Sequence, residues 1–305
     1  MGDPGGLIKL KYVLAAGGRC LRSHAVIVLS ALRRSSGEFA APLDGSLSNL
    51  MKRKVYLVGA GPGDPELLTM KACRLLGEAQ IVLHDDLVNR GILRLASPSA
   101  RIQNVGKRCG RPHISQEEIH SQMVSFATQG LTVVRLKGGD PLLYGRAGEE
   151  MEALRHAGIE FEVVPGVTAA LGAAASARIP LTDRRLASKV VFLSNHLCSG
   201  ESPPLEKNSI SADTTVVVYM PGTDYGDLAV KFCSAGLDPQ TCCLVVSCAT
   251  TEQQQIHSRT LEKLAATPGL PAPALLIVGG VAGHYSSGEN PAMGSRTSLG
   301  TTALK

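Results

Sequence analysis

The chain has 305 residues, of which 44% are hydrophobic and 19% charged, and its formal net charge at pH 7 is +5. This length suffices for one large domain or for two domains of ordinary size. The composition excludes a disordered chain, because disorder goes with few apolar residues and a high net charge, and no apolar run is long enough to cross a bilayer. The weak, scattered positive charge indicates no nucleic-acid partner and is compatible with an acidic small-molecule substrate.

The eight cysteines are spread along the chain, with no CxxC pair and no His/Cys cluster at the spacing of metal ligands. We therefore expect no metal site, a reducing compartment and a cytoplasmic location. Cys242 and Cys243 are adjacent in an apolar run, where small apolar residues of a strand are the simplest interpretation.

The two ends of the chain differ from its middle. Residues 1–50 are basic, rich in Ala and Ser and interrupted by Gly, and they resemble an organelle transit peptide only loosely. Because the first strand-like run begins three residues after Met51, we expect a disordered leader, or a segment that precedes the native start at Met51. Residues 284–305 are rich in Gly, Ser and Thr without periodicity, which predicts a flexible tail.

Short apolar runs alternate with helical patterns in between. The predicted strands of a first set end in glycine-rich turns, and the predicted helices lie between them. These strands are 54–61, 79–86, 100–107, 131–140 and 159–166, and the clearest helices are 65–79 and 148–158. This alternation predicts an α/β fold with mainly parallel pairing and a ligand at the carboxyl ends of the strands.

A second set of strand-like runs follows a polar, proline-containing break near residues 180–188. Its runs are 189–196, 214–222, 240–249 and 273–281. The two sets predict two α/β lobes, residues 51–186 and 187–283, with mainly parallel or mixed sheets and an active-site cleft between them.

The first turn, "VGAGPGDPELLT" at residues 58–69, raises the possibility of dinucleotide binding. The dinucleotide fingerprint is G-x-G-x-x-G, whereas Gly59, Gly61 and Gly63 give G-x-G-x-G and Asp64 stands in the sixth position, where the fingerprint has glycine. Asp64 before Pro65 is typical of a helix N-cap with proline at the first helical position. A carboxylate there repels a pyrophosphate, although Asp85, about twenty residues on, keeps the dinucleotide alternative open.

Two later turns have the same chemistry. Residues 136–145 read "LKGGDPLLYG", and residues 163–177 read "VVPGVTAALGAAASA", a turn followed by a helix of small residues. Small residues allow backbone and ligand to approach closely. A ligand without phosphates and with a cationic centre suits three such turns.

Six segments together resemble the tetrapyrrole methylase family, over about residues 53–282: "VYLVGAGPGDPELLT", "VGKRCGRPHISQEEI", "VVRLKGGDPLLYGRAGEE", "VVPGVTAALGAAASARIPLTDR", "VVVYMPG" and "PALLIVGGV". The resemblance implies S-adenosyl-L-methionine as the methyl donor. Within the family, the segment around Lys107 with the later Gln116-Glu117-Glu118 resembles the branch that acts on uroporphyrinogen III.

The resemblance implies methylation of uroporphyrinogen III at C2 and C7, giving precorrin-2 by way of precorrin-1, for siroheme or cobalamin biosynthesis. It also implies a homodimer. Two alternatives remain open. One is a methyltransferase for another corrin position, and the other is a non-catalytic protein that binds a tetrapyrrole or a dinucleotide.

The resemblance also assigns roles to individual residues. Asp85 is the expected proton acceptor and Lys107 the expected proton donor. The expected donor site consists of Pro62, Gly138, Gly139, Asp140, Leu143, Thr168, Ala169, Met220 and Ala249. The carboxylates of the substrate call for arginines, because a planar guanidinium holds a carboxylate by two hydrogen bonds, and the candidates are Arg108, Arg111, Arg146 and Arg184.

Four short stretches depart from the family's usual residues. The family usually has Tyr-Asp-Arg, Leu-Thr-His-Arg, Thr-Gly-His and Tyr-Met-Gly. This chain has His84-Asp85-Asp86, Leu181-Thr182-Asp183-Arg184, Ser194-Asn195-His196 and Tyr219-Met220-Pro221 at those places. Asp86 and Asp183 put acids near the expected site of a polyanionic substrate.

Overall fold

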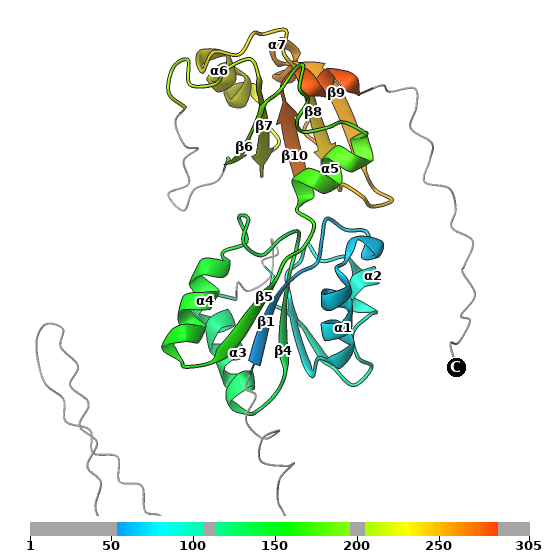
Figure 1. The fold of residues 1–305 in the computed structure, drawn as a ribbon, viewed down its shortest axis with the longest axis vertical. Coiled ribbons are helices and arrows are strands. Elements are labelled where there is room, and N and C mark those ends of the chain that lie inside the picture. Colours follow the sequence, from blue (N-terminus) through cyan, green and yellow to red (C-terminus); the bar gives the residue numbers. More distant parts are fainter. Residues whose placement is uncertain (1–53, 107–113, 196–204, 286–305) are drawn as a thin grey trace, which may run out of the picture. The chain divides into compact units, whose positions relative to one another are not determined.

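The computed structural model describes residues 54–106, 114–195 and 205–285 (Figure 1). These residues form two five-stranded sheets with helices on both faces of each. The strands of the first sheet are β1 (Lys54–Gly59), β2 (Ile81–His84), β3 (Arg101–Asn104), β4 (Val133–Lys137) and β5 (Glu160–Val164). Those of the second are β6 (Lys189–Ser194), β7 (Thr214–Tyr219), β8 (Cys242–Ser247), β9 (Gln255–Thr260) and β10 (Ala274–Val278).

The first sheet is wholly parallel, in the order β3-β2-β4-β1-β5. Because β1 lies between β4 and β5, the turns that follow these three strands meet at one edge. In the register, Arg135 of β4 lies opposite Leu57 of β1 and Leu83 of β2, and Lys137 lies opposite Gly59.

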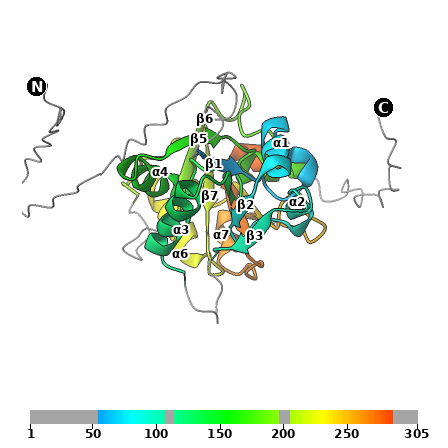
Figure 2. The same cartoon turned by 90° about the horizontal axis from the view of Figure 1, so that it is seen from below.

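Helices cover both faces of this sheet (Figures 1 and 2). Helices α1 (Met70–Glu78) and α2 (Arg90–Leu93) pack on one face, and α3 (Gln116–Thr128) and α4 (Ala147–His156) pack on the other. Between β1 and α1 lies a single 3-10 turn, η2 (Pro65–Leu67), with Asp64 as its N-cap and Pro65 first. The predicted helix 65–79 is thus divided, and α1 itself begins after a second N-cap, Thr69, whose hydroxyl accepts from the Ala72 amide.

The second sheet is mixed, in the order β6-β7-β10-β8-β9. Only β6 and β7 are parallel, and the other pairs are antiparallel. Strand β9 escaped the sequence prediction because its "QIHSRT" residues are polar and largely exposed.

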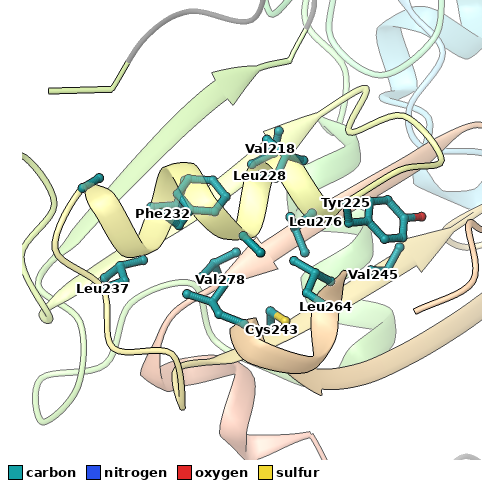
Figure 3. Close-up of a cluster of buried hydrophobic side chains, with 14 of the residues drawn as sticks. Val218, Tyr225, Leu228, Phe232, Leu237, Cys243, Val245, Leu264, Leu276 and Val278 are labelled. Atoms are coloured by element: carbon teal, nitrogen blue, oxygen red, sulfur yellow. The ribbon is translucent and has the colours of Figure 1, made fainter. Parts of the chain in front are cut away.

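The core of the second sheet lies on both of its faces. Helices α6 (Gly226–Ser234) and α7 (Leu261–Leu264) bury Phe232 and Tyr225 with valines of the sheet, as Figure 3 shows. Truncation of a fully buried phenylalanine of this kind costs about 3–5 kcal/mol. Helix α5 (Ala169–Ala177) and the 3-10 helix η3 (Gly280–His284) pack on the opposite face.

The α/β fold with one parallel and one mixed sheet confirms the predicted fold class. In the part of the chain that the structure describes, no helix has both the length and the apolar character needed to span a membrane. The leader, residues 1–50, lies outside the described residues, and so does nearly all of the tail, residues 286–305. The domain boundary at residues 186 and 187 stays a prediction.

Candidate active site

The three glycine-rich turns of the first sheet lie against one another. Gly61 and Gly139 exchange backbone hydrogen bonds of 3.1 and 2.8 Å. A methyl group at Gly59 would lie 2.6 Å from the Cα of Gly166 and 2.7 Å from the carbonyl oxygen of Gly139. No side chain fits there, so glycine permits a backbone-to-backbone approach that the sequence alone only suggested.

Two aspartates of these turns are occupied by backbone amides. Asp140 accepts from the amide of Leu142 (2.8 Å) and from that of Gly166 (3.0 Å), and it thereby ties the second turn to the third. Asp64 accepts from the Glu66 amide at 2.9 Å, as expected for an N-cap. Negative charge at both turns makes the site unsuitable for a pyrophosphate.

The first turn also contacts α5 and the loop after β8. A methyl group at Gly172 of α5 would lie 2.6 Å from the Pro62 ring. The Asp64 amide donates to the Thr250 hydroxyl (3.1 Å), and a methyl group at Gly63 would lie 3.3 Å from the Ala249 carbonyl oxygen.

Tyr219, at the end of β7, joins the second and third turns. Its hydroxyl lies 2.5 Å from the Thr168 hydroxyl and accepts from the Ala170 amide at 3.3 Å. Its ring packs on Tyr144, with a centroid separation of 4.9 Å. Burial raises the pKa of the Tyr219 hydroxyl, so this group is a neutral donor and acceptor at physiological pH.

The residues predicted for the donor site lie on or beside these contacts. Leu143 and Ala169 pack against the same apolar cluster that contains Ala249 and Tyr219, and Met220 follows Tyr219 with a left-handed backbone (φ 52°) and 46% exposure. The structure therefore brings together Pro62, Gly138, Gly139, Asp140, Leu143, Thr168, Ala169, Met220 and Ala249. Their roles in binding a donor stay a prediction.

Asp85 lies just beyond β2, at the same edge of the sheet. Its Oδ1 accepts a hydrogen bond of 2.5 Å from Nη2 of Arg135, which is buried, while the Asp85 side chain itself is 28% exposed. Alternation along β4 places Arg135 and Lys137 on the face covered by α3 and α4. A buried guanidinium thus holds a carboxylate at the boundary with solvent.

A buried carboxylate completes this cluster. Glu150 of α4 is 0% exposed, and its Oε1 accepts from Arg135 Nε (3.0 Å), from Lys137 Nζ (2.8 Å) and from Gln116 Nε2 (3.4 Å). Burial works against the charge of Arg135, but Asp85 and Glu150 hold its pKa above the ordinary value. Burial and the neighbouring Arg135 lower the pKa of Lys137.

The sequence prediction missed Arg135, Lys137 and Glu150. A signal for two of them was present, because charges at alternate positions of an otherwise apolar strand run must be buried on one face. Their partner on α4 carried no such signal, since Glu149, Glu150 and Glu152 lie close together in the same helix.

The predicted substrate arginines are placed only in part. Lys107, Arg108 and Arg111 lie outside the described residues. Gly106, the residue before them, lies so close to Asp86 that a methyl group on it would be 2.2 Å from the Asp86 amide nitrogen. Gly106, the last described residue before this gap, therefore lies beside Asp86.

The other two predicted arginines are exposed. Arg146 forms a two-bond ion pair with Glu149 (2.8 and 2.6 Å), and Arg184 is exposed in the turn before β6. The roles of Arg146 and Arg184 in binding a substrate carboxylate stay a prediction.

Among residues 54–106, 114–195 and 205–285, no group of three or more His, Cys, Asp or Glu side chains is arranged to hold a metal ion. Cys243 is buried in β8, and burial raises the pKa of its thiol to about 12. This agrees with the interpretation of Cys243 as an apolar strand residue.

These features define a two-sheet α/β protein. Its three glycine-rich turns and the charged cluster around Arg135 lie at the carboxyl edge of the parallel sheet. The family model described as Tetrapyrrole (Corrin/Porphyrin) Methylases matches residues 54–265. The chain belongs to the tetrapyrrole methylase family.

Individual relatives agree with this assignment. The chain is 47% identical over 232 residues to the chloroplastic S-adenosyl-L-methionine-dependent uroporphyrinogen III methyltransferase of Arabidopsis thaliana, covering 74% of this chain and 63% of that protein. It is 43% identical over 233 residues to the uroporphyrinogen-III C-methyltransferase of Paracoccus denitrificans, covering 75% of this chain and 81% of that protein. Of several siroheme synthases it spans only about half the length, 52% and 49% in two cases.

A solved structure is similar over the same stretch. It is the uroporphyrin-III C-methyl transferase of Thermus thermophilus complexed with S-adenyl homocysteine, with a TM-score of 0.66 and 42% identity, covering 75% of this chain and 98% of that chain.

Proposed function

We propose that the chain transfers methyl groups from S-adenosyl-L-methionine to C2 and C7 of uroporphyrinogen III. The product is precorrin-2, formed by way of precorrin-1, and it serves siroheme or cobalamin biosynthesis. The observation that carries this proposal is the meeting of the three turns around Gly61, Gly139 and Gly166, together with relatives that are named for this activity.

The residues at these turns fit the proposed donor. S-adenosyl-L-methionine supplies, when bound, an electrophilic methyl group on a positively charged sulfonium. Asp64 and Asp140 contribute negative charge to the turns, and backbone amides donate to both carboxylates. Pro62, Leu143 and Met220 offer apolar surface for the uncharged part of such a ligand. A dinucleotide is disfavoured for the same reason.

The chain's own residues act by position and by proton transfer. Close packing of the turns fixes the donor site, and orientation of two reactants is a major source of rate enhancement. Asp85 takes up the proton that the substrate ring releases after it has been methylated, and Arg135 holds this carboxylate in place. Lys107 is the proposed proton donor, and it directly follows Gly106, which lies beside Asp86, the neighbour of Asp85 in the chain.

The proposed substrate is a polyanion, which calls for arginines. Arg108 follows Lys107 directly in the chain, Arg111 comes three residues later, and Arg146 and Arg184 are exposed. We propose that these four residues receive its carboxylates. The chain is further proposed to act as a homodimer in the cytoplasm. Sedimentation of the purified chain tests the dimer, and imaging of the tagged full chain tests the compartment.

The decisive experiment is anaerobic incubation of the purified chain with uroporphyrinogen III and radiolabelled S-adenosyl-L-methionine. We expect two labels per tetrapyrrole, at C2 and C7, as located by NMR of the product. Label at another position, or only in another corrin precursor, would favour the alternative methyltransferase. Binding of the tetrapyrrole without any transfer would favour a binding protein, and tighter binding of NAD than of S-adenosyl-L-methionine in calorimetry would favour the dinucleotide alternative.

A further inference from the structure

Three charged side chains are buried beneath the carboxyl edge of the first sheet. Arg135, Lys137 and Glu150 are 2%, 3% and 0% exposed, and no other Lys, Arg, Asp or Glu of the described residues is buried. Burial of charge is costly even when the charges are paired, and apolar residues of the same volume often stabilise a protein as well or better. Stability alone therefore does not account for this cluster.

Both cations bond to the same oxygen of Glu150. Arg135 Nε and Lys137 Nζ lie 3.0 and 2.8 Å from Oε1, whereas Oε2 is buried without a hydrogen-bond partner. The position of Oε1 thus determines the rotation of the Arg135 fork about its long axis. Lys137 offsets the negative charge of Glu150, so that the positive charge of Arg135 can offset that of Asp85.

The remaining nitrogens of Arg135 are also engaged. Its Nη1 donates to the carbonyl oxygens of Leu83 and Leu136, both at 3.4 Å, and its Nη2 donates to Asp85 Oδ1 at 2.5 Å. A guanidinium that is held along each of its edges is a rigid donor. Asp85 is the one member of the cluster that reaches solvent, with 28% exposure.

We propose that Arg135, Glu150 and Lys137 form a positioning network that orients the Asp85 carboxylate for proton transfer, with Glu150 acting through Arg135. The inference rests on the proposed function, in which Asp85 accepts a proton. Two anions and two cations balance, so the network orients Asp85 without a surplus charge.

Other polar groups border this network. The His84 ring nitrogen Nδ1 lies 2.9 Å from the Asp85 carbonyl oxygen, and Asp86 follows directly in the chain. On α3, Gln116 bonds to Glu150 and to the ring of His120. The pH dependence of kcat in a variant of the network must therefore be compared with the pH dependence of kcat in variants of these neighbouring groups.

The proposal is tested by a double-mutant cycle between Arg135 and Asp85. Arg135→Lys keeps the charge but lacks the fork that reaches both carboxylates. We expect its kcat to fall by about 10- to 100-fold, because small misplacements of a catalytic group have effects of this size. Its KM for S-adenosyl-L-methionine should stay within about twofold, since the hydrogen bonds of Arg135 go to Asp85, Glu150 and the carbonyl oxygens of Leu83 and Leu136, none of which is a predicted donor residue.

The cycle separates positioning from a structural role. In the Asp85→Asn background, Arg135→Lys should lower kcat by less than about twofold, because the group that it positions is gone. Glu150→Gln preserves volume and should behave like Arg135→Lys, whereas Glu152→Gln, the same change on the exposed side of α4, should have no effect. Full additivity of Arg135→Lys and Asp85→Asn would overturn the proposal, as would an unchanged kcat in Glu150→Gln.

A readout without turnover keeps the test independent of the proposed function. In ¹⁵N NMR, the Arg135 Nε–H signal is assigned by its loss in Arg135→Lys, and folding is checked by thermal melting. This signal should shift in Asp85→Asn and in Glu150→Gln but not in Glu152→Gln. An unchanged signal in Asp85→Asn would overturn the network, whereas absence of methyl transfer by the unmodified chain, with the shifts present, would overturn only the proposed function.

Discussion

Alanine at position 59 is the most direct test of the meeting of the three turns. The added methyl group would lie 2.6 Å from both the Cα and the amide nitrogen of Gly166 and 2.7 Å from the Gly139 carbonyl oxygen. All three contacts are with backbone, so no side chain can rotate away. Overpacking of this kind costs about 1–3 kcal/mol, and the rigid surroundings favour the upper value.

This cost has two measurable consequences. At about 2–4 °C per kcal/mol for a domain of this size, Gly59→Ala should melt about 6–12 °C below the unmodified chain. Because the second and third turns must move away from Gly59, binding of S-adenosylhomocysteine in calorimetry should weaken by about tenfold or more. This is in line with the loss expected for a misplacement of about 1 Å.

Gly77→Ala is the matched control. Gly77 lies in α1, and a methyl group there would contact nothing within 4 Å. Alanine in a helix is more favourable than glycine by about 1 kcal/mol, so this variant should melt slightly higher and bind as before. If Gly59→Ala melted and bound like Gly77→Ala, the close approach of the turns would be refuted.

Three further predictions concern the chemistry, the pH dependence and the leader. Asp85→Asn should keep its affinity for S-adenosylhomocysteine but lower the rate of methyl transfer by about a hundredfold, a usual contribution of an acid–base group. If Asp85→Asn and Lys107→Met both transferred methyl groups as fast as the unmodified chain, positioning alone would drive the reaction. Hydrogen bonds from the Ser188 and Ser211 hydroxyls, both 2.5 Å, lower the pKa of Asp213 from 3.8 to about 2. The stabilising contribution of Asp213 is thus present above pH 3.8 and is lost as the pH falls through about 2. The melting temperature of Asp213→Asn should therefore lie below that of the unmodified chain at pH 7 and approach it at pH 2. A difference in melting temperature that persists at pH 2 would contradict this linkage. Deletion of residues 1–50 should leave melting and methyl transfer unchanged, because the described fold begins at Lys54, and an insoluble or inactive product would show that the leader packs on the core.

The sequence predicted the parallel sheet and its turns well because their signals are local. Strand β1 is a continuous apolar run from Val55 that ends in glycine, and such runs are typical of parallel strands buried on both faces. Strand β9 was missed, because an exposed edge strand such as "QIHSRT" has no apolar pattern to reveal it. The candidate donor-site residues were predicted through a resemblance, and the contacts between the turns that carry them, such as that of Gly59 with Gly166, could not be read from spacing.

The charged cluster was beyond the sequence for a different reason. Arg135 bonds to Asp85, 50 residues away in the chain, and to Glu150, 15 residues away. Which carboxylate pairs with which cation depends on the register between β2 and β4 and on the rotation of α4. Propensity and periodicity determine neither of these quantities.

The departures from the family's usual residues become intelligible through their local contacts. Asp183 receives a two-bond ion pair from Arg185 (2.9 and 3.1 Å), whose hydrogen bonds hold the pKa of Asp183 well below its usual range. His284 lies 3.7 Å from the same carboxylate. Asp183 therefore has a counter-charge, Arg185, in its own surroundings, and it adds little net repulsion toward a polyanionic substrate.

Asp86 is constrained in a comparable way, by the turn that precedes Lys107. Its Oδ1 accepts from the Asn104 amide group at 2.5 Å, and Asn104 in turn accepts from the Gly106 amide at 2.7 Å. Asp86 thus orients the Asn104 side chain, which in turn holds the backbone amide of Gly106. The family's usual arginine at this position cannot accept the bond from Asn104, so this chain builds the turn with a different contact. Asn195 and Pro221, two further departures, also contact each other, since the Asn195 side-chain amide donates to the Pro221 carbonyl oxygen at 3.3 Å. In each of these cases, contacts within the chain accommodate the unusual residue. The charge pattern can therefore depart from the family's, while the three turns and the Asp85–Arg135 pair keep the arrangement on which the proposed methyl transfer rests.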